Sequence, residues 1–176
     1  MTDISIIVPF YNAWHHTHQV LMDLYKTNQG RYEIILVNDA STEPDVHKGL
    51  KWWRDLGAVD FKVANREQNG GFGEAMNYGV EKSSGDIVIL LSNDVRILST
   101  TYDLGKEIKS VLDLQPESLV GGQIVDWEAG WNQFGDLVIP YLYGWLIACK
   151  RKVWDELGGF DPIYKPYDYE EKYSNG

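Results

Sequence analysis

The stretch LLSNDV, Leu90–Val95, marks the point where an apolar strand gives way to polar side chains. The run Ile87–Leu91 leads directly into Ser92, Asn93 and Asp94, with no apolar residue among these three. A continuous apolar run of this kind is typical of a parallel strand that is covered on both faces. The sequence therefore predicts a central strand whose carboxyl end presents polar groups to a crevice.

Three earlier apolar runs are separated from this strand by helical patterns, so strands and helices alternate through the first two thirds of the chain. The predicted strands are Ile4–Phe10, Tyr32–Val37 and Val59–Ala64. The predicted helices are Trp14–Thr27, a segment from about Pro44 to Leu56 capped by Ser41 or Thr42, and a segment that ends near Gly85. This alternation predicts an α/β fold with a mostly parallel central sheet flanked by helices.

The pattern changes after Ser99. The expected elements there are a helix at Tyr102–Leu114, a strand at Leu119–Val125, an irregular aromatic segment at Asp126–Tyr143, and a short helix closed by Gly158 and Gly159. No repeat, linker or low-complexity tract interrupts the chain, so we expect residues 1–176 to form a single domain.

Composition limits the classes of partner. The formal net charge is -10, from 16 basic and 26 acidic residues, which argues against nucleic acid because a phosphate backbone requires a basic surface. The apolar run Leu137–Cys149 is interrupted by Pro140 and Gly144 and is too short to span a bilayer, so no transmembrane segment is expected. The lone cysteine, Cys149, excludes a disulfide framework and favours a reducing, cytoplasmic location.

Polar motifs follow three of the predicted strands: PFYN, VNDAS and LLSND. The carboxyl ends of parallel strands meet at one edge of the sheet, and ligands collect at that edge. There Asp94 can hold a hard divalent cation, which would let an acidic protein bind an anionic ligand. A turn role for Asp94 is equally expected, because loops that follow strands are rich in Asp and Asn.

Five motifs in this order and spacing, VPFYN, VNDAS, NGGFGEAMNYG, LLSNDV and GGFD, resemble the family 2 glycosyltransferases with the GT-A fold, in particular the rhamnosyl- and galactofuranosyltransferase-like members. The resemblance spans Ile4 to about Glu171. It implies transfer of a sugar from a UDP- or dTDP-sugar donor to a hydroxyl acceptor, such as a glycan, with inversion and with Mn²⁺ or Mg²⁺ as cofactor. Residues 1–95 would be the nucleotide-binding half and residues 96–176 the acceptor-side half, which the sequence leaves either complete or truncated.

The resemblance also implies roles for individual residues. The nucleotide-binding residues would be Pro9, Tyr11, Asn12, Asp39, Asn69, Gly71, Asn77 and Asn93. Tyr11 would pack near the base, and Asp39 would accept a hydrogen bond from the uracil or thymine imide. Asp94 would bind the cation that stabilises the departing diphosphate. Glu170 and Glu171 match the family's acidic pair, and Glu171 would be the general base.

Two positions depart from the family pattern. Ser92 stands where many members have the first aspartate of the metal motif, and Met76 stands where an arginine often precedes the asparagine. These departures support a second hypothesis, a non-catalytic sugar-nucleotide- or glycan-binding protein of the same fold. The pair Glu170 and Glu171 is also explained by a solvated acidic stretch. A nucleotidyltransferase is disfavoured because no glycine-rich, basic loop follows the first strand.

Other conspicuous residues have simpler interpretations. His15, His16 and His18 are expected on the solvated face of a helix, and Cys149 is expected to be a small core residue. The aromatic side chains Trp127, Trp131, Tyr141 and Tyr143 either stack on an acceptor sugar or fill the core. The sequence leaves the oligomeric state open.

Overall fold

The computed structural model describes residues 3–27, 32–57, 61–98, 103–121 and 144–161, and the backbone of strands 131–134 and 137–140. In chain order the elements are β1 (Ile4–Phe10), α1 (Trp14–Thr27), β2 (Glu33–Asn38), α2 (Pro44–Leu56), β3 (Phe61–Asn65), α3 (Phe72–Glu81), β4 (Ile87–Leu91), α4 (Leu104–Leu114), β5 (Val120–Gly121), β6 (Trp131–Phe134), β7 (Leu137–Pro140), β8 (Leu146–Lys150) and α5 (Arg151–Leu157). The predicted alternation of strands and helices from β1 to β4 is confirmed.

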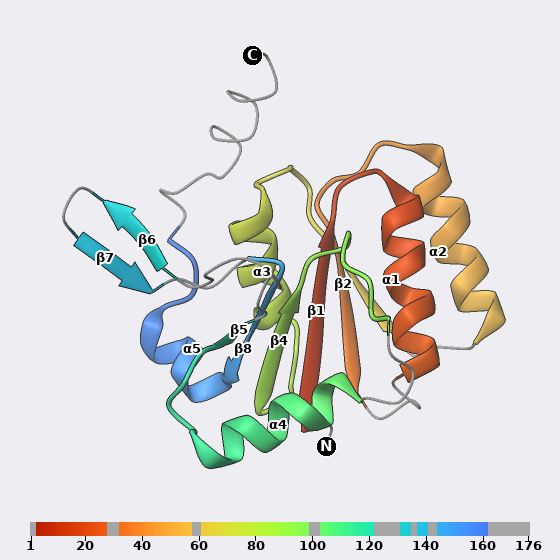
Figure 1. Ribbon diagram of the computed structural model, residues 1–176. Coiled ribbons are helices and arrows are strands. Elements are labelled where there is room, and N and C mark those ends of the chain that lie inside the picture. Colours follow the sequence, from red (N-terminus) through yellow and green to blue (C-terminus); the bar gives the residue numbers. More distant parts are fainter. Residues whose placement is uncertain are drawn as a thin grey trace.

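The main sheet has six strands in the order β3-β2-β1-β4-β8-β5 (Figure 1). The pairings among β3, β2, β1 and β4 are parallel, whereas β8 runs antiparallel to both β4 and β5. The α/β class is thus confirmed, and the sheet is mixed with a parallel majority. The strand order reverses at β1, which has β2 on one side and β4 on the other. In sheets of this kind, ligands bind outside the carboxyl ends of the strands at such a reversal.

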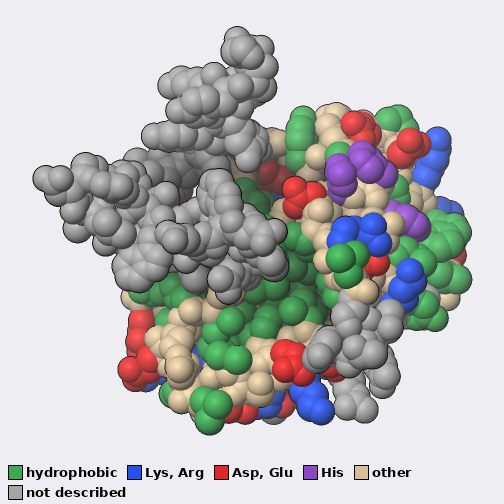
Figure 2. Space-filling model, viewed as in Figure 1, with side chains coloured by type: hydrophobic (Ala, Val, Ile, Leu, Met, Phe, Trp, Pro, Cys, Tyr) green, Lys and Arg blue, Asp and Glu red, His purple; other side chains and the backbone are tan. Residues whose placement is uncertain are grey.

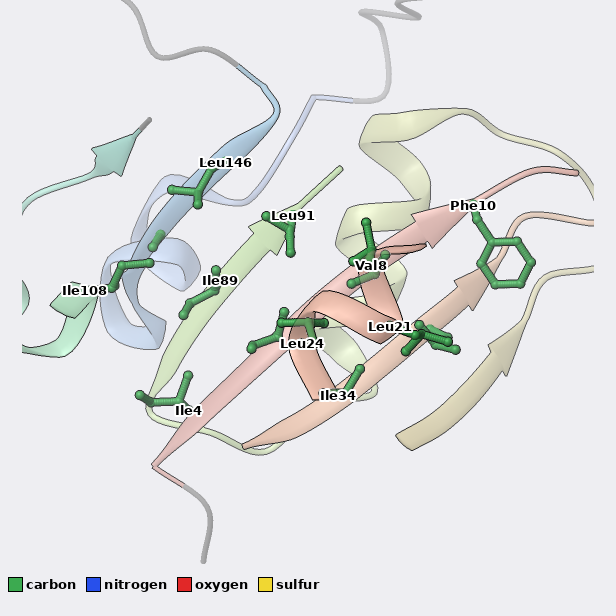
Figure 3. Close-up of a cluster of buried hydrophobic side chains, with 14 of the residues drawn as sticks. Ile4, Val8, Phe10, Leu21, Leu24, Ile34, Ile89, Leu91, Ile108 and Leu146 are labelled. Atoms are coloured by element: carbon green, nitrogen blue, oxygen red, sulfur yellow. The ribbon is translucent and has the colours of Figure 1, made fainter. Parts of the chain in front are cut away.

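The core lies on both faces of the sheet, because successive side chains of a strand point to opposite faces. All seven residues of β1 are buried. On one face, Ile6 and Val8 belong to a cluster with side chains of α1, α2 and α4. Figure 3 shows Val8 of this cluster with Leu21 and Leu24 of α1. On the other face, Ile7 belongs to a cluster with side chains of α3 and α5. This two-sided burial explains why β1 lacks the alternation of apolar and polar residues that a half-exposed strand shows.

The start of α2 differs from the predicted cap. Glu43 immediately precedes the helix, and neither Ser41 nor Thr42 is its cap. The hydroxyl of Ser41 instead accepts a hydrogen bond from the backbone N–H of Asn12 at 2.8 Å. The Asn12 side chain in turn accepts from the backbone N–H groups of Thr42 and Glu43 at 2.8 and 3.0 Å. Asn12, in the loop after β1, therefore provides hydrogen-bond partners for the chain that leads into α2.

Helix α3 ends at Glu81, not near Gly85 as predicted. The backbone N–H of Ser84 donates to the carboxylate of Glu33 at 2.7 Å, and that of Gly85 donates to the hydroxyl of Ser5 at 2.8 Å. These contacts with the sheet replace helical hydrogen bonds, so the chain leaves the helix and turns into β4. A Cβ at Gly85 would lie 2.6 Å from the backbone nitrogen of Ser5, which explains a glycine at this close approach.

Strands β6 and β7 form a separate antiparallel pair within the segment Asp126–Tyr143, which the sequence predicted to be irregular. The sequence Gly135-Asp136 between two short runs is a hairpin signal, but the aromatic content of the segment obscured it. Of the predicted strand Leu119–Val125, β5 covers Val120–Gly121, and the rest of that predicted strand after Gly121 lies outside the described part.

Of the helices in the described ranges, none combines the length and apolar character that a bilayer crossing requires.

The end of the described chain follows the prediction closely. Cys149 is buried in β8, and this burial raises the pKa of its thiol to about 11, so the residue is a protonated part of the core. Helix α5 ends at Gly158, which adopts a left-handed conformation with φ of 77°. Glycine is favoured at this helix position because it has no Cβ.

Candidate functional site

A cavity of about 570 Å³ opens at the carboxyl edge of the sheet, where the strand order reverses. Its walls come from the chain that follows β1, β2 and β4, from the start of α3, and from the residues before β8. The lining residues are Pro9, Phe10, Tyr11, Asp39, Gly71, Phe72, Ala75, Ser92, Asn93, Asp94, Gly144 and Trp145. Six residues predicted for the site thus lie around one cavity: Pro9, Tyr11, Asp39, Gly71, Asn93 and Asp94. A slightly larger cavity of about 590 Å³ lies elsewhere, around the start of α5, and contains none of them.

Asp39 is the most deeply buried acid of the cavity, with 3% of its surface exposed. Its carboxylate accepts from the Arg66 guanidinium at 2.6 Å and from the backbone N–H of Gly71 at 2.9 Å. The backbone N–H of Gly70 lies 3.2 Å from the same carboxylate. Asp39 therefore fixes the glycine-rich entry to α3 as well as facing the cavity.

Arg66 was not predicted as a site residue. It follows β3 and lies at the same sheet edge, where its second guanidinium nitrogen donates to Glu74 at 2.6 Å. Burial lowers the pKa of Arg66, but the hydrogen bonds and charges of Glu74 and Asp39 outweigh this effect and hold the pKa above its usual value. In an acidic sequence, a basic residue directly after a parallel strand was the signal that could have identified it.

The Ser92–Asp94 segment has a defined internal structure. The hydroxyl of Ser92 donates to the carboxylate of Asp94 at 2.5 Å, and the Asn93 amide donates to the hydroxyl of Thr17 in α1 at 3.1 Å. The backbone N–H of Ser92 donates to the carbonyl of Trp145 at 3.0 Å. Asp94 is exposed at the mouth of the cavity. Its carboxylate is accessible to a cation, although one of its oxygens already accepts the hydrogen bond from the Ser92 hydroxyl.

A cation at this position would need ligands in addition to Asp94 and its neighbours in the described part of the chain. Within the described ranges, no group of three or more His, Cys, Asp or Glu side chains is arranged to hold a metal ion. One carboxylate still fits a small hard cation, because Mg²⁺ and similar ions keep several waters and bind substrate phosphates as further ligands. The residues present are therefore compatible with a cation that arrives together with a diphosphate.

Three predicted nucleotide-binding residues do not line the cavity. Asn12 organises the chain before α2, as described above. The Asn69 side chain accepts from the backbone N–H of Gly71 at 3.1 Å, and so shapes the glycine-rich entry. The Asn77 side chain forms two hydrogen bonds with the backbone of Phe160. Their contacts in the structure are with other parts of the protein.

Residues 5–145 match the family model described as glycosyl transferase family 2. The chain belongs to this family. Among curated relatives, an uncharacterized glycosyltransferase of Rickettsia felis is 24% identical over 185 residues, which cover 94% of this chain and 30% of the relative. Glycosyltransferase GlyA of Streptococcus pneumoniae is 24% identical over 167 residues, which cover 92% of this chain and 22% of the relative. The chain thus spans less than a third of the length of these two relatives.

Solved structures of glycosyltransferases have the same fold as this family 2 chain. The mannosyltransferase PcManGT from Pyrobaculum calidifontis, solved in complex with GDP-Man and Mn²⁺, superposes with a TM-score of 0.75 at 20% identity and covers 91% of this chain and 48% of its own. TarS residues 1–349 from S. aureus, in complex with UDP, give a TM-score of 0.69 at 20% identity and cover 93% of this chain and 51% of that chain. The predicted GT-A fold is confirmed.

The two departures from the family pattern have structural counterparts. Met76, where an arginine often stands, is fully buried in the cluster between α3 and the sheet. A methionine there adds core packing but no charge. Ser92, in place of an aspartate, supplies a neutral hydroxyl that is bonded to Asp94. The predicted acidic pair, Glu170 and Glu171, lies outside the described residues.

The histidines of α1 do not form a metal site with any described residue. His15 and His16 are exposed, as predicted, and their ring centroids lie 3.9 Å apart. Histidine side chains are visible on the surface of the molecule in Figure 2. His18 differs from the prediction, because its Nδ1 accepts a hydrogen bond from the indole N–H of Trp53 at 3.0 Å. His18 therefore helps to join α1 to α2.

Proposed function

We propose that this chain transfers a sugar from a nucleotide-diphosphate donor, UDP- or dTDP-linked, to a hydroxyl acceptor such as a glycan, with inversion at the anomeric carbon. The observation that carries this proposal is the convergence of Pro9, Tyr11, Asp39, Gly71 and Asp94 on one cavity at the strand-order reversal. Family membership and the fold support it. The names of relatives that bind UDP or GDP-Man indicate the ligand class but leave the donor sugar to experiment.

The nucleoside would lie between β1 and the glycine-rich entry. Tyr11, which is 46% exposed, offers an aromatic face for stacking on the base. Asp39 faces the cavity with a carboxylate that can accept one more hydrogen bond, such as that of a pyrimidine imide. The backbone N–H groups of Gly70 and Gly71 already donate to Asp39 and Asn69, so an anionic part of the ligand would face the N–H groups of the first turn of α3, from Phe72 onward.

The diphosphate would lie toward Asn93 and Asp94. Asp94 would hold Mn²⁺ or Mg²⁺, and a cation bound there would supply positive charge that stabilises the departing diphosphate. Asn93, held by Thr17, would fix the backbone beside it. This arrangement accounts for an anionic ligand on a protein with a formal net charge of -10.

The reaction itself requires a base on the face of the sugar opposite the diphosphate. The acceptor oxygen forms a bond to the anomeric carbon while the bond from that carbon to the diphosphate oxygen breaks, and the acceptor proton passes to a carboxylate. We assign this role to Glu171, with Glu170 as the alternative, on the basis of the acidic pair in the sequence. The rhamnosyl- and galactofuranosyltransferase-like members make dTDP-rhamnose and UDP-galactofuranose the first donors to test.

A binding protein without turnover is the second candidate function. The observation that favours it is the hydrogen bond between Ser92 and Asp94. Ser92 stands where many family members have another metal-binding aspartate, and its hydroxyl donates to one of the two carboxylate oxygens of Asp94. Turnover of a labelled donor, compared with binding of the same donor, separates the two functions.

Isothermal calorimetry with UDP and dTDP tests the site. We expect binding in the presence of Mn²⁺ and weaker binding in EDTA, because Asp94 and the diphosphate share the cation. An exchange of Asp94 for Asn should remove most of this difference. Equal affinity in Mn²⁺ and EDTA would make Asp94 a turn residue, and absence of binding in both would contradict a nucleotide site.

Replacement of Glu171 by Gln tests the assigned base. Gln keeps the shape of the side chain but cannot accept the proton, so donor binding should persist while transfer falls by a factor on the order of 100 to 10,000. Glu170→Gln is the matched control. If Glu170→Gln is inactive and Glu171→Gln is fully active, the roles are exchanged; if both variants are active, the pair is a solvated surface.

A further inference from the structure

The side chain of Asn77 pairs with the backbone of Phe160 like one strand residue with another. Its Nδ2 donates to the Phe160 carbonyl at 2.8 Å, and its Oδ1 accepts from the Phe160 N–H at 2.9 Å. Asn77 lies in α3, whereas Phe160 follows α5 in the GGFD segment. Both polar ends of a single amide are therefore used to hold a backbone segment that is 83 residues away in the sequence.

The turn that Asn77 holds is packed closely against α3 and α5. Gly159 has φ of 74°, and a Cβ there would lie 2.6 Å from Oδ1 of Asn77. The Phe160 ring packs edge-on against Phe72 and Trp154, with ring centroids 6.0 and 5.5 Å away. The glycine thus allows the turn to approach α3, and the Phe160 ring lies against aromatic side chains of α3 and α5.

Helix α3 therefore serves two parts of the molecule. Its first turns supply Phe72 and Ala75 to the wall of the cavity. Two residues after Ala75, Asn77 holds the turn at Gly159 and Phe160, from which the sequence continues to Glu170 and Glu171. The same short helix thus contacts both the cavity and the turn that follows α5.

We propose that Asn77 is a positioning residue. By holding the turn at Phe160, it would fix the position of the following segment, which carries Glu170 and Glu171, relative to the donor cavity, and it would make no contact with the nucleotide. This inference rests on the proposed transferase function. Its chemical basis is that an in-line displacement requires the base and the donor carbon to be aligned, and a displacement of about 1 Å can cost about 100-fold in rate.

The variant Asn77→Asp tests the proposal with almost no change in shape. The carboxylate cannot donate to the Phe160 carbonyl and faces it with negative charge. At a temperature where the variant is folded, we expect the Kd for UDP with Mn²⁺ to change by less than about twofold and kcat for transfer to fall by about 10- to 100-fold. Tyr78→Phe is the matched control on the next residue of α3, because it loses one long, exposed hydrogen bond at 3.4 Å and should change neither quantity.

A double-mutant cycle tests the contact without any assay of transfer. Gly159→Ala should be strongly destabilising alone, because the φ of 74° disfavours any side chain and because the new methyl group meets the Asn77 oxygen. It should cost less free energy of unfolding in an Asn77→Ala background, where that oxygen is absent. The cycle therefore remains informative if the parent protein binds UDP but transfers no sugar.

The outcomes are distinct. Loss of UDP affinity in Asn77→Asp, in proportion to the loss of transfer, would make Asn77 a nucleotide ligand and overturn the proposal. Unchanged transfer in a folded Asn77→Asp variant would also overturn it, as would additive effects in the cycle. Absence of UDP binding by the parent protein would contradict the proposed function. The double-mutant cycle would then still show whether Asn77 and Gly159 are energetically coupled.

Discussion

At the scale of single residues, Asp39 combines two tasks in one buried carboxylate. It faces the cavity, and it also accepts hydrogen bonds from the glycine-rich entry to α3 and from Arg66. A buried ion pair of this kind contributes little net stability when intact, but removal of one partner leaves the other without compensation. Binding and stability should therefore change together at this position.

We predict that Asp39→Ala weakens UDP binding and lowers the free energy of unfolding by about 1 to 3 kcal/mol, because the donors at Gly70 and Gly71 lose their acceptor. Urea unfolding and calorimetry measure the two effects. Glu74→Gln is the control, since it alters the other partner of Arg66 and leaves the Asp39 contacts in place. An Asp39→Ala variant with parental UDP affinity would remove Asp39 from the binding site.

At the scale of elements, the sequence predicted where the strands end, but it did not predict side-chain contacts between elements that are distant in the sequence. The apolar runs located β1, β2 and β4, and the topology that they imply brought Pro9, Asp39 and Asp94 to one edge. The pairing of Asn77 with Phe160 has no local signature, because an asparagine in a helix has the same sequence context whether it binds a ligand or a backbone turn. The contacts of Asn12, in the loop after β1, were equally hidden, because their partners at Thr42 and Glu43 lie 30 and 31 residues away in the sequence.

The loop after β4 illustrates such a contact between distant parts of the sequence. Asp23 of α1 is 3% exposed and accepts from the Arg96 side chain at 2.7 Å and from the backbone N–H of Ile97 at 3.2 Å. Gln19 donates to its other oxygen at 3.0 Å. Burial raises the pKa of Asp23, but these three hydrogen bonds outweigh it and hold the pKa below its usual range. Helix α1 thus braces the segment that carries Asp94.

We predict that Asp23→Asn loosens this segment, so that UDP binding in Mn²⁺ weakens while UDP binding in EDTA stays unchanged. The lost charge should also lower the free energy of unfolding by about 1 kcal/mol at neutral pH. Because the folded pKa lies below the unfolded value of 3.8, this contribution is complete above that value and is lost as the pH falls through the lowered pKa.

Asp113→Asn is the matched control for Asp23→Asn. Asp113 pairs with Lys109 on the surface of α4, where ion pairs contribute little. We expect no change in UDP binding from this exchange. An equal loss of Mn²⁺-dependent binding in both variants would indicate a general effect of charge and would contradict the bracing role of Asp23.

At the scale of the whole molecule, the sheet edge opposite the cavity is held by another buried acid. Glu33 accepts from Ser5 at 2.6 Å, from the backbone N–H of Ser84 at 2.7 Å and from Lys62 at 2.6 Å. Burial raises the pKa of Glu33, but these hydrogen bonds dominate and lower it from 4.5 to about 2. The network joins β1, β2, β3 and the chain that enters β4.

We predict that Glu33 makes the domain sensitive to acid. Its contribution is complete above the unfolded pKa of 4.5 and is lost as the pH falls toward about 2, with a total on the order of 3 kcal/mol. Urea unfolding at several pH values measures this slope, which Glu33→Gln should flatten. Glu81→Gln, at an exposed ion pair, should leave the slope intact. A parental slope in Glu33→Gln would assign acid sensitivity to other carboxylates.

The antiparallel pairing of β4 with β8 makes the first half of the domain depend on a strand that is synthesised much later. When the ribosome has completed β4, four parallel strands can assemble, but the IVILL backbone remains an open edge until Leu146–Lys150 emerge. An apolar edge of this kind is a template for intermolecular pairing. We therefore expect a chain that stops between these strands to aggregate, which would make residues 1–95 an assembly stage of the fold and not an autonomous module.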